Sequence, residues 1–460
     1  MTDHALYRSH NHHDSRPHVV IVGGGFAGIS AMESLAKAPV DITLIDRNGY
    51  HTFQPLLYQV AAGGLNPGDV TMSFRAIAAR QPNVRFRHGN VVQVDTQEQV
   101  VTLHDDTKIT YDYLFIATGV TANFFGIPGA QEHSHIIYTR RDALATRDHL
   151  FSRLETLAQS VGKEGEFNIV VVGGGATGVE VAGAMAEMAV EALPRAYPEL
   201  DPNKIRVYLV EMGEELLAPF KERIRDYTAA ALEKRRVILK LGTAVEEITD
   251  DEVVLSDGSH IASKSIIWCT GVTAPEDVKR WQLPQGPGGR VLIDPECRVV
   301  GFQNVFAGGD VSADTVEPLP QLAQPATQHG THVAAQIERL LAGEPLEPFQ
   351  YDNKGIMATI TRNAAVAQLP GGQTLTGFPA FSAWVSLHIA VLLSNRNRLA
   401  VLTNLAWRYV SWRRHFNVII GDVYSEQGER KHQRTADSIA RNPGGSTCAH
   451  AGPADKKAAG

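Results

Sequence analysis

Residues 18–30, HVVIVGGGFAGIS, carry three glycines in the spacing G-x-G-x-x-G, directly after a run of β-branched residues. Residues 169–183, IVVVGGGATGVEVAG, repeat this pattern further along the chain. Each run predicts a buried parallel strand, and the residues after the glycines predict an Ala-rich helix. A strand–turn–helix unit of this kind binds the pyrophosphate of a dinucleotide. One unit could be a glycine turn of an ordinary sheet, but two units predict two dinucleotides and electron transfer between them.

The three glycines of such a loop have separate roles. The first permits the tight turn, the second lets the backbone approach the pyrophosphate, and the third lets the helix pack on the strand. The helix N-terminus then offers N–H groups and the positive end of its dipole to the phosphates. These roles fall to Gly23, Gly25 and Gly28 in the first loop and to Gly173, Gly175 and Gly178 in the second.

A carboxylate for the ribose hydroxyls is expected at the end of the next strand. The run VDITLID ends in Asp46 at about the expected distance from the first loop. The run IRVYLVE ends in Glu211, which comes later than expected. The extra length contains three prolines and predicts an inserted element after the second phosphate-binding helix: Pro194, Pro198 and Pro202.

The composition is that of a soluble globular protein with two or three domains. The chain has 460 residues and a formal net charge of −7, which gives no reason to expect nucleic-acid binding. Its three cysteines, Cys269, Cys297 and Cys448, are far apart and form no C-x-x-C pair. This spacing fits a reducing compartment and disfavours a flavin–disulfide mechanism. The His-rich first residues lack the apolar core of a secretory signal, and no metal site is expected.

The chain order predicts an α/β fold of two doubly wound, Rossmann-like dinucleotide-binding domains, each with a β-meander insert. Residues 18–129 form the first part of one domain, in which YDYLFIATG ends at Thr118–Gly119. Residues 130–270 repeat the plan and end in SIIWCTG. Residues 271–370 return to the first domain through NVFAGGDVS, which carries Asp310. The polar tails, residues 1–17 and 426–460, are expected to be disordered.

Residues 371–425 differ from the rest and predict helices that dock on a membrane. No Asp or Glu occurs between Gly371 and Gly421, and five arginines supply positive charge. The densest apolar part, Phe378 to Leu393, is shorter than the roughly 20 residues of a membrane span. The next stretch predicts an amphipathic helix in the membrane interface. Its apolar face would hold Leu402, Leu405, Tyr409, Trp412 and Phe416, and its polar face Asn404, Arg408, Ser411 and His415. A dimer interface is the alternative use of the same apolar face, and both uses can coexist.

Several further motifs occur in a characteristic order: YHTFQPLLYQVAAGGL, ATG, VEMGEELL, NVFAGGD, AQPATQHG and YDNKGIMATITRNAAV. Together with the two loops they resemble the two-dinucleotide-binding-domain flavoproteins. Within that group, residues 18–425 resemble the type II NADH dehydrogenases, single-subunit NADH:quinone oxidoreductases that do not pump protons. The phosphate loops are shared by many flavoproteins, whereas FQPLLYQVAAG, AQPATQ and the basic apolar C-terminus are more specific. The chain looks most like the mycobacterial-type members.

The resemblance implies that non-covalent FAD binds the first loop and NADH the second. Asp46 would hold the ADP half of FAD, and Asp310 would lie near its ribityl–phosphate portion. Thr118, Gly119, Gln54 and Lys354 would also contact the FAD, although a surface lysine is the alternative for Lys354. Glu211 would hold the NADH ribose. A 2′-phosphate would be repelled by Glu211, and no Lys or Arg follows it directly, so NADH is predicted over NADPH.

The resemblance also implies catalytic residues. Glu180 would face the nicotinamide–flavin contact and help to deliver protons to the quinone; the alternative is a carboxylate that only favours the helix N-terminus. Gln324 and Gln328 lie one helical turn apart and would flank the quinone head group; the alternative is two surface glutamines. His329 is a weaker candidate for the proton donor.

The implied partners are NADH, a membrane quinone and the lipid surface, with a homodimer on the cytoplasmic face of the cell membrane as a peripheral, monotopic protein. Menaquinone and ubiquinone are both compatible with the sequence. A sulfide:quinone oxidoreductase, a ferredoxin-type reductase and a catalytically silent NAD(H)-binding sensor are the alternative functions. The first needs cysteines beside the flavin, the second gives no reason for the basic apolar tail, and the third does not explain the FAD-side motifs.

Overall fold

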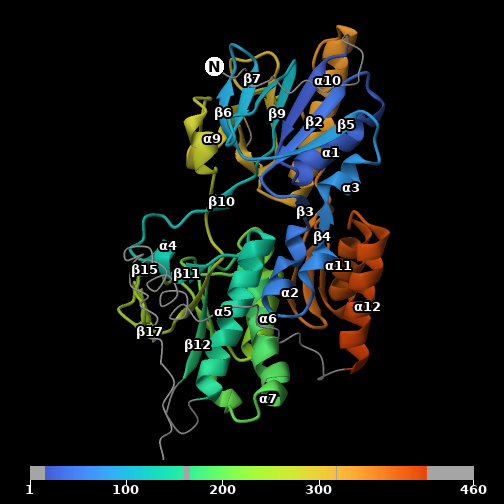
Figure 1. Ribbon diagram of the computed structural model, residues 1–460. Coiled ribbons are helices and arrows are strands. Elements are labelled where there is room, and N and C mark those ends of the chain that lie inside the picture. The colour runs from blue at the N-terminus through green and yellow to red at the C-terminus, as the bar shows by residue number, and fades with distance from the viewer. Residues whose placement is uncertain (1–15, 160–165, 317–318, 412–460) are drawn as a thin grey trace, which may run out of the picture. The chain divides into compact units, whose positions relative to one another are not determined.

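The computed structural model describes residues 16–159, 166–316 and 319–411. In this part of the chain, two sheets of five parallel strands each are the main scaffold (Figure 1). The first has the order β21-β9-β1-β2-β5 and the second the order β11-β18-β12-β13-β14. The first sheet contains β1 (His18–Val22), β2 (Asp41–Asp46), β5 (Val84–His88), β9 (Tyr113–Ile116) and β21 (Val305–Ala307). The second contains β11 (Ser134–His135), β12 (Phe167–Val172), β13 (Ile205–Val210), β14 (Val237–Lys240) and β18 (Ser265–Trp268).

The strand order brings distant parts of the chain together. Strand β21 pairs with β9 in the first sheet, although the whole second sheet lies between them in the sequence. Helices α1 (Phe26–Ser34) and α10 (Ala323–Ala342) pack against each other beside this sheet. The antiparallel pair β10 (Thr121–Ala122) and β19 (Val272–Thr273) forms where the chain passes between the two sheets. The α/β dinucleotide-binding fold predicted from the sequence is therefore confirmed.

Each parallel sheet has an antiparallel meander inserted between two of its strands in the sequence, before β9 in the first sheet and before β18 in the second. One consists of β6 (Val91–Asp95), β7 (Val100–Leu103) and β8 (Lys108–Thr110). The other consists of β15 (Val245–Ile248), β16 (Glu252–Leu255) and β17 (His260–Ala262). Two-stranded pairs are β3 (Tyr50–Thr52) with β4 (Thr71–Ser73), and β20 (Val291–Ile293) with β22 (Ser312–Asp314). The further helices are α2 (Leu57–Ala61), α3 (Phe74–Ala78), α4 (Ala130–His133), α5 (Arg140–Ala158), α8 (Glu222–Lys234) and α9 (Glu276–Arg280).

An inserted element separates the second phosphate-binding helix from β13, as the late position of Glu211 predicts. Helix α6 (Ala176–Glu187) continues into the π-helical turn η4 (Met188–Ala192) and then into α7 (Leu193–Ala196). A short 3₁₀ helix, η5 (Pro202–Lys204), leads into β13. Pro202 begins this helix, where its fixed φ is favourable and its missing N–H costs nothing.

A third sheet follows α10 and contacts the second phosphate-binding helix. It consists of the antiparallel strands β23 (Ile356–Thr361), β24 (Ala364–Gln368) and β25 (Thr374–Gly377). Helix α6 and strand β23 lie in very close contact at Gly183, where a Cβ atom would lie only 1.5 Å from the Ile360 carbonyl oxygen. Only glycine at position 183 therefore allows α6 to pack this closely against β23.

Two helices, α11 (Phe378–Ala390) and α12 (Asn395–Ser411), follow the third sheet and lie side by side (Figure 1). Helix α11 packs on β24, where small residues, among them Ala365 and Ala367, let Ala380 come close. In the described part of the chain, no helix combines the length and the apolar character needed to cross a membrane.

The polar face predicted for α12 packs in part against the rest of the protein. Asn404, assigned to the polar face, is half-buried and donates from Nδ2 to Oδ2 of Asp69 at 2.7 Å. Asn397 is also buried and donates to the Thr71 carbonyl oxygen at 2.8 Å. The inward face of α12 is therefore partly polar, because it satisfies hydrogen-bonding groups of residues 69–71.

Leu402, assigned to the apolar face, does lie outward with 48% of its surface exposed. The side chains of Arg408, Tyr409 and Ser411 lie outside the described residues, as do Trp412, Arg413, Arg414, His415 and Phe416. The same holds for Cys448 and for both predicted tails, apart from Arg16 and Pro17.

Candidate active site

The two glycine-rich loops have nearly the same geometry. Gly23 and Gly173 have φ of +106° and +112°, which L side chains rarely adopt. Their N–H groups donate to the Ile45 and Val210 carbonyl oxygens, both at 2.8 Å. A Cβ on Gly28 would lie 1.9 Å from the Gly23 oxygen, and one on Gly178 would lie 1.7 Å from the Gly173 oxygen. The first and third glycines of each loop are therefore required by the protein itself.

The second glycine of each loop is different. A Cβ on Gly25 or Gly175 would meet no protein atom within 4 Å. Each residue also lies at the N-cap of its helix, α1 or α6. A glycine that the protein does not need for its own packing, placed before free helical N–H groups, fits the close approach of a phosphate. Both loops thus fit the pyrophosphate of a dinucleotide.

The two expected carboxylates are held beside the loops by backbone N–H groups. Asp46 accepts from Gly24 N at 2.8 Å and from Asn48 N at 2.7 Å. Glu211 accepts in the same manner from Gly174 N at 2.5 Å and from Gly213 N at 2.7 Å. Burial raises the pKa of Asp46, and the two N–H donors partly offset this effect.

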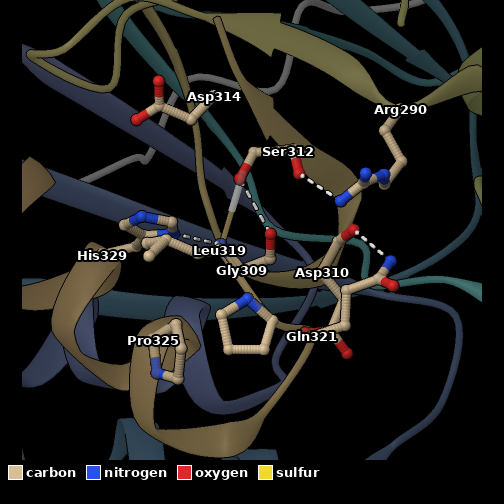
Figure 2. Close-up of a pocket in the computed structure, with 10 residues that line it drawn as sticks. Arg290, Gly309, Asp310, Ser312, Asp314, Leu319, Gln321, Pro325 and His329 are labelled. Carbon is tan, nitrogen blue, oxygen red and sulfur yellow. Dashed lines mark hydrogen bonds between the residues drawn. The ribbon is translucent and has the colours of Figure 1, made fainter. Parts of the chain in front are cut away.

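A polar pocket surrounds the turn η7 (Gly309–Val311), and Figure 2 shows its lining. Asp310 lies in this turn, and burial raises the pKa of its carboxyl group to about 6, against the opposing effect of Arg290. The Arg290 guanidinium donates to the Ser312 carbonyl oxygen at 3.3 Å, and Gln321 Nε2 donates to the Asp310 carbonyl oxygen at the same distance (Figure 2). The pocket therefore combines an acid and a cation.

His329 fixes the turn that carries Asp310. Its Nδ1 accepts from the Gly309 N–H at 3.0 Å, so the ring proton is on Nε2 (Figure 2). Burial lowers the pKa of His329 to about 4, which keeps the ring neutral. The His329 ring thus holds the backbone of this turn, and its weaker candidacy as a proton donor stays a prediction.

Thr118 and Gly119 follow strand β9 and lie next to the first glycine-rich loop, beside Gly23. A Cβ on Gly23 would lie 2.9 Å from the Thr118 Cα. The Thr118 hydroxyl is buried and has no hydrogen-bond partner among the described residues. Gly119 has φ of +67° and faces open space. A buried hydroxyl left unpaired beside a phosphate loop is the kind of group that a bound cofactor satisfies.

Gln324 and Gln328 both hold the backbone of the loop before β23. Gln324 donates to the Gly355 carbonyl oxygen at 2.9 Å and accepts from Lys354 N at 3.2 Å. Gln328 donates to the Asp352 carbonyl oxygen and accepts from Asp352 N, both at 2.9 Å. Each side-chain amide thus forms one donated and one accepted hydrogen bond with the backbone of this loop. The second N–H of each amide group stays available for another acceptor. Lys354 on the loop is exposed and forms an ion pair with Asp352, and Gln54 is also exposed.

Glu180 lies on α6, half-buried, at the junction with β23. Its Oε1 accepts from Thr359 N at 3.1 Å and from Thr359 Oγ1 at 3.4 Å. Nearby, the Trp384 ring lies edge-on to the Tyr58 ring, with centroids 6.3 Å apart. Tyr58 on α2 bonds Thr359 Oγ1 at 2.7 Å. Burial raises the pKa of Glu180 to about 8, so the group holds a proton at neutral pH. Burial also raises the pKa of Tyr58.

Three members of this cluster, Tyr58, Thr359 and Trp384, were not among the residues predicted from the sequence. Tyr58 lies inside the motif FQPLLYQ, but the motif does not indicate that its side chain belongs to this cluster. Thr359 and Trp384 lie in apolar stretches and have no local pattern that distinguishes them from core residues. Only the packing of α6, β23, α2 and α11 brings the cluster together.

The two cysteines within the described residues do not form a redox pair. Cys269 and Cys297 are free thiols. Burial raises the pKa of Cys269 to about 12 and also raises the pKa of Cys297, so both remain protonated at neutral pH. Across residues 16–159, 166–316 and 319–411, no group of three or more His, Cys, Asp or Glu side chains could hold a metal ion.

Several known proteins are similar to this one in sequence over most of the chain. The pyridine nucleotide-disulphide oxidoreductase family matches residues 17–330. The type II NADH:quinone oxidoreductase Ndh of Mycobacterium tuberculosis is 35% identical over 418 residues, which are 87% of this chain and 89% of that protein. The chain belongs to the type II NADH:quinone oxidoreductase family. Another member, NdhA of the same organism, is 36% identical over 85% of this chain and 86% of its own length. The family predicted from the motifs is therefore confirmed.

Solved structures support the same fold. NDH2 from Plasmodium falciparum, in complex with NADH, matches with a TM-score of 0.80 at 20% identity, over 87% of this chain and 99% of that chain. The sulfide:quinone oxidoreductase from Aquifex aeolicus matches with a TM-score of 0.67, also at 20% identity, over 87% of this chain and 96% of that one. At such identities the likeness concerns the fold alone. The family assignment rests on the mycobacterial type II oxidoreductases instead.

Proposed function

We propose that this type II oxidoreductase takes a hydride from NADH into a non-covalently bound FAD and passes two electrons to a membrane quinone, without pumping protons. The observation that carries the proposal is the pair of loops with matched geometry, one in each parallel sheet, in a member of this family. Each loop leaves its second glycine open to a phosphate and is followed by an anchored carboxylate.

FAD is assigned to the domain formed by residues 18–129 and 271–370. Gly23, Gly25 and Gly28 would receive its pyrophosphate and Asp46 its ribose. Thr118, Gly119, Asp310, Gln54 and Lys354 are the further residues assigned to it. The orphaned Thr118 hydroxyl and the polar pocket at Asp310 support this choice. A bound flavin supplies the two-electron chemistry, and the protein provides position, charge and exclusion of water.

NADH is assigned to the domain formed by residues 130–270. Gly173, Gly175 and Gly178 would receive its pyrophosphate, and Glu211 its ribose hydroxyls. The backbone bonds from Gly174 and Gly213 fix the Glu211 carboxylate where a 2′-phosphate would be repelled. Met212, which follows Glu211, is 75% exposed and brings no positive charge. The second loop therefore favours NADH over NADPH.

Quinone reduction consumes two protons, and Glu180 is the group that we assign to hold one of them. Its raised pKa keeps the acid protonated at neutral pH. Gln324 and Gln328 keep the loop before β23 in place, and each amide retains an N–H that can face a quinone carbonyl. Sulfide chemistry is not favoured, because both described cysteines are buried, protonated thiols.

Helices α11 and α12 are assigned to the lipid surface, on the cytoplasmic face of the membrane. Apolar side chains project outward from both: Phe378, Leu387, Val391, Leu399, Leu402 and Trp407. Arg396 and Arg398 lie beside them at the start of α12 and suit anionic lipid. The same face can also hold a second copy in a homodimer.

An anaerobic titration tests the electron path. The detergent-purified protein is mixed with NADH while the flavin absorbance is followed, and a quinone analogue is then added. We expect the flavin absorbance to bleach with NADH and to recover with the quinone. Bleaching without recovery would move the acceptor to another class of molecule. A bound flavin that NADH does not bleach would contradict the proposal and favour a binding or sensing role.

A further inference from the structure

A buried imidazole holds one peptide of the first glycine-rich loop. His51 lies on β3, is 4% exposed, and its Nδ1 lies 2.8 Å from the Gly24 carbonyl oxygen. A carbonyl oxygen can only accept a hydrogen bond, so Nδ1 carries a proton and donates it to Gly24. Burial lowers the pKa of His51, which keeps the ring neutral. The motif YHTFQPLLYQVAAGGL contains this histidine, but the proposed function gives it no task.

Aromatic rings keep the imidazole in this position. The His51 ring lies edge-on to the Phe26 ring, with centroids 5.7 Å apart, and edge-on to the Phe74 ring at 6.5 Å. Phe74 also packs on the loop itself, since a Cβ on Gly24 would lie 2.2 Å from its ring. One side of the loop peptide is therefore covered by packed rings, and His51 donates a hydrogen bond to the peptide from this side.

The second loop holds the corresponding peptide in another way. Gly174 takes the place of Gly24, and the N–H of each donates to the carboxylate beside its own loop. The Gly174 carbonyl oxygen accepts from the Leu217 backbone N–H at 2.9 Å. Both loops thus fix this residue through its N–H and its C=O. The donor to the C=O is a backbone amide in one loop and the His51 side chain in the other, so a substitution can remove it only from the first loop.

Fixing the Gly24 carbonyl oxygen also fixes the Gly25 N–H. The two groups share one planar trans peptide unit, in which they point in opposite directions. Because the oxygen points to His51, the Gly25 N–H points away from the packed rings, and it donates to no other residue in the described part of the chain. A Cβ on Gly25 would meet no protein atom within 4 Å, so there is room for a ligand at this residue.

We propose that His51 is a positioning residue of the first loop: its imidazole N–H holds the Gly24 carbonyl oxygen, so that the Gly25 N–H is set for the pyrophosphate of FAD before the cofactor binds. The inference rests on the proposed function, which assigns FAD to this loop. A peptide between two glycines meets little steric resistance to rotation. Without the imidazole, its orientation would have to be fixed when FAD binds, and this cost weakens binding.

The test compares FAD retention in two variants of the holoenzyme. His51→Leu removes the donor, whereas His51→Asn keeps an N–H donor close to the position of Nδ1. Flavin released on stepwise dilution is separated by ultrafiltration and gives the Kd for FAD. We expect Kd to rise about tenfold in His51→Leu, equal to about 1.4 kcal/mol, because a buried acceptor loses its donor. His51→Asn should stay within about threefold of the unaltered protein.

Phosphorus NMR of the bound FAD reports on the contact with the loop directly. The pyrophosphate signals should move in His51→Leu and stay close to their original positions in His51→Asn. With FAD in excess, the NADH concentration that gives half-maximal flavin reduction should not change in either variant, because the Leu217 backbone N–H holds the second loop. A general loss of stability would not produce this combination.

His149→Leu is the matched control, because His149 also bonds a backbone carbonyl oxygen, that of Lys264, at 2.9 Å. This histidine belongs to the domain assigned to NADH, so its replacement should leave the Kd for FAD and the phosphorus signals in place. A Kd in His51→Leu no higher than in this control would overturn the inference. Equal loss of FAD from His51→Leu and His51→Asn would also overturn it, since packing of the ring would then be the cause.

A further substitution covers the case that His51→Leu does not fold. Thienylalanine at position 51 replaces the imidazole by a five-membered ring without an N–H, and the same rise in Kd is expected. If the unaltered protein binds no flavin, the proposed function fails and the inference fails with it. If the unaltered protein binds flavin and only the rise in Kd is missing, the inference alone fails.

Discussion

Gly175→Ala gives the sharpest test of the assignment of the second loop to NADH. The added methyl group would meet no protein atom within 4 Å, in contrast to the 1.7 Å approach that a Cβ on Gly178 would make to a backbone oxygen. Alanine is a poorer N-cap than glycine by roughly 0.5–1 kcal/mol, and the reduced freedom of the unfolded chain, worth about 0.4–1 kcal/mol, offsets most of this cost. We therefore expect the free energy of unfolding to change by less than about 0.5 kcal/mol.

NADH binding should respond much more strongly than stability. A phosphate oxygen approaches a backbone N–H to about 2.9 Å, whereas a methyl carbon needs about 3.5–4.0 Å from its neighbours. The pyrophosphate must then move by several tenths of an ångström or more, at a cost typical of overpacking, about 1–3 kcal/mol. This corresponds to a roughly 5- to 150-fold weaker affinity for NADH.

The assay is anaerobic stopped-flow reduction of the flavin at increasing NADH concentration. The concentration that gives half of the maximal rate should rise in Gly175→Ala, with the flavin content unchanged. Gly371→Ala is the matched control, since a Cβ there also meets nothing within 4 Å and Gly371 lies in a turn far along the chain. Gly25→Ala, in the loop assigned to FAD, should instead lower the flavin content of the purified protein. If Gly175→Ala stayed within about twofold of the Gly371→Ala control, equal to about 0.4 kcal/mol, the pyrophosphate would not lie on this loop.

Three further outcomes follow from the same structure. Glu180→Gln should slow quinone-driven reoxidation by roughly a hundredfold or more and abolish the fall in rate that we expect as the acid ionises above about pH 8; stopped-flow rates across pH measure both, and an unchanged rate would remove Glu180 from the reaction. Glu211→Ser removes the charge that repels a 2′-phosphate, so the NADPH-to-NADH ratio of kcat/KM should rise about tenfold; a constant ratio would exclude the role of Glu211. Leu399→Asp with Leu402→Asp should release the protein from sedimented membranes with little change in Tm, because these side chains are 62% and 48% exposed; continued sedimentation would contradict docking through α12.

The parts of this protein that the sequence predicted well are local. The two loops, their strands and helices and the insert before β13 all follow from glycine spacing, apolar runs and prolines. The family also followed from short motifs, and relatives at 35% and 36% identity confirm it. The outward position of Leu402 was predictable from helical periodicity as well.

Other features were set by contacts that no pattern in the sequence encodes. Helical periodicity placed Asn404 on the polar face of α12, but not its partner, the Asp69 carboxylate. Gln324 and Gln328 were correctly expected on one helical face, but their bonds to the backbone before β23 depend on where that loop lies. Periodicity describes a single element, whereas the partner of a polar group is decided by the element packed against it.

The sequence alone thus determined two phosphate loops, their carboxylates and a basic, apolar C-terminal segment, because each depends on residues close together in the chain. Only the tertiary structure decided the surroundings of Glu180. Its bond to Thr359 joins residues 179 positions apart, and it forms because Gly183 lets α6 approach β23 so closely. Burial at that junction, rather than the carboxyl group itself, raises the pKa of Glu180 and makes it an acid at neutral pH.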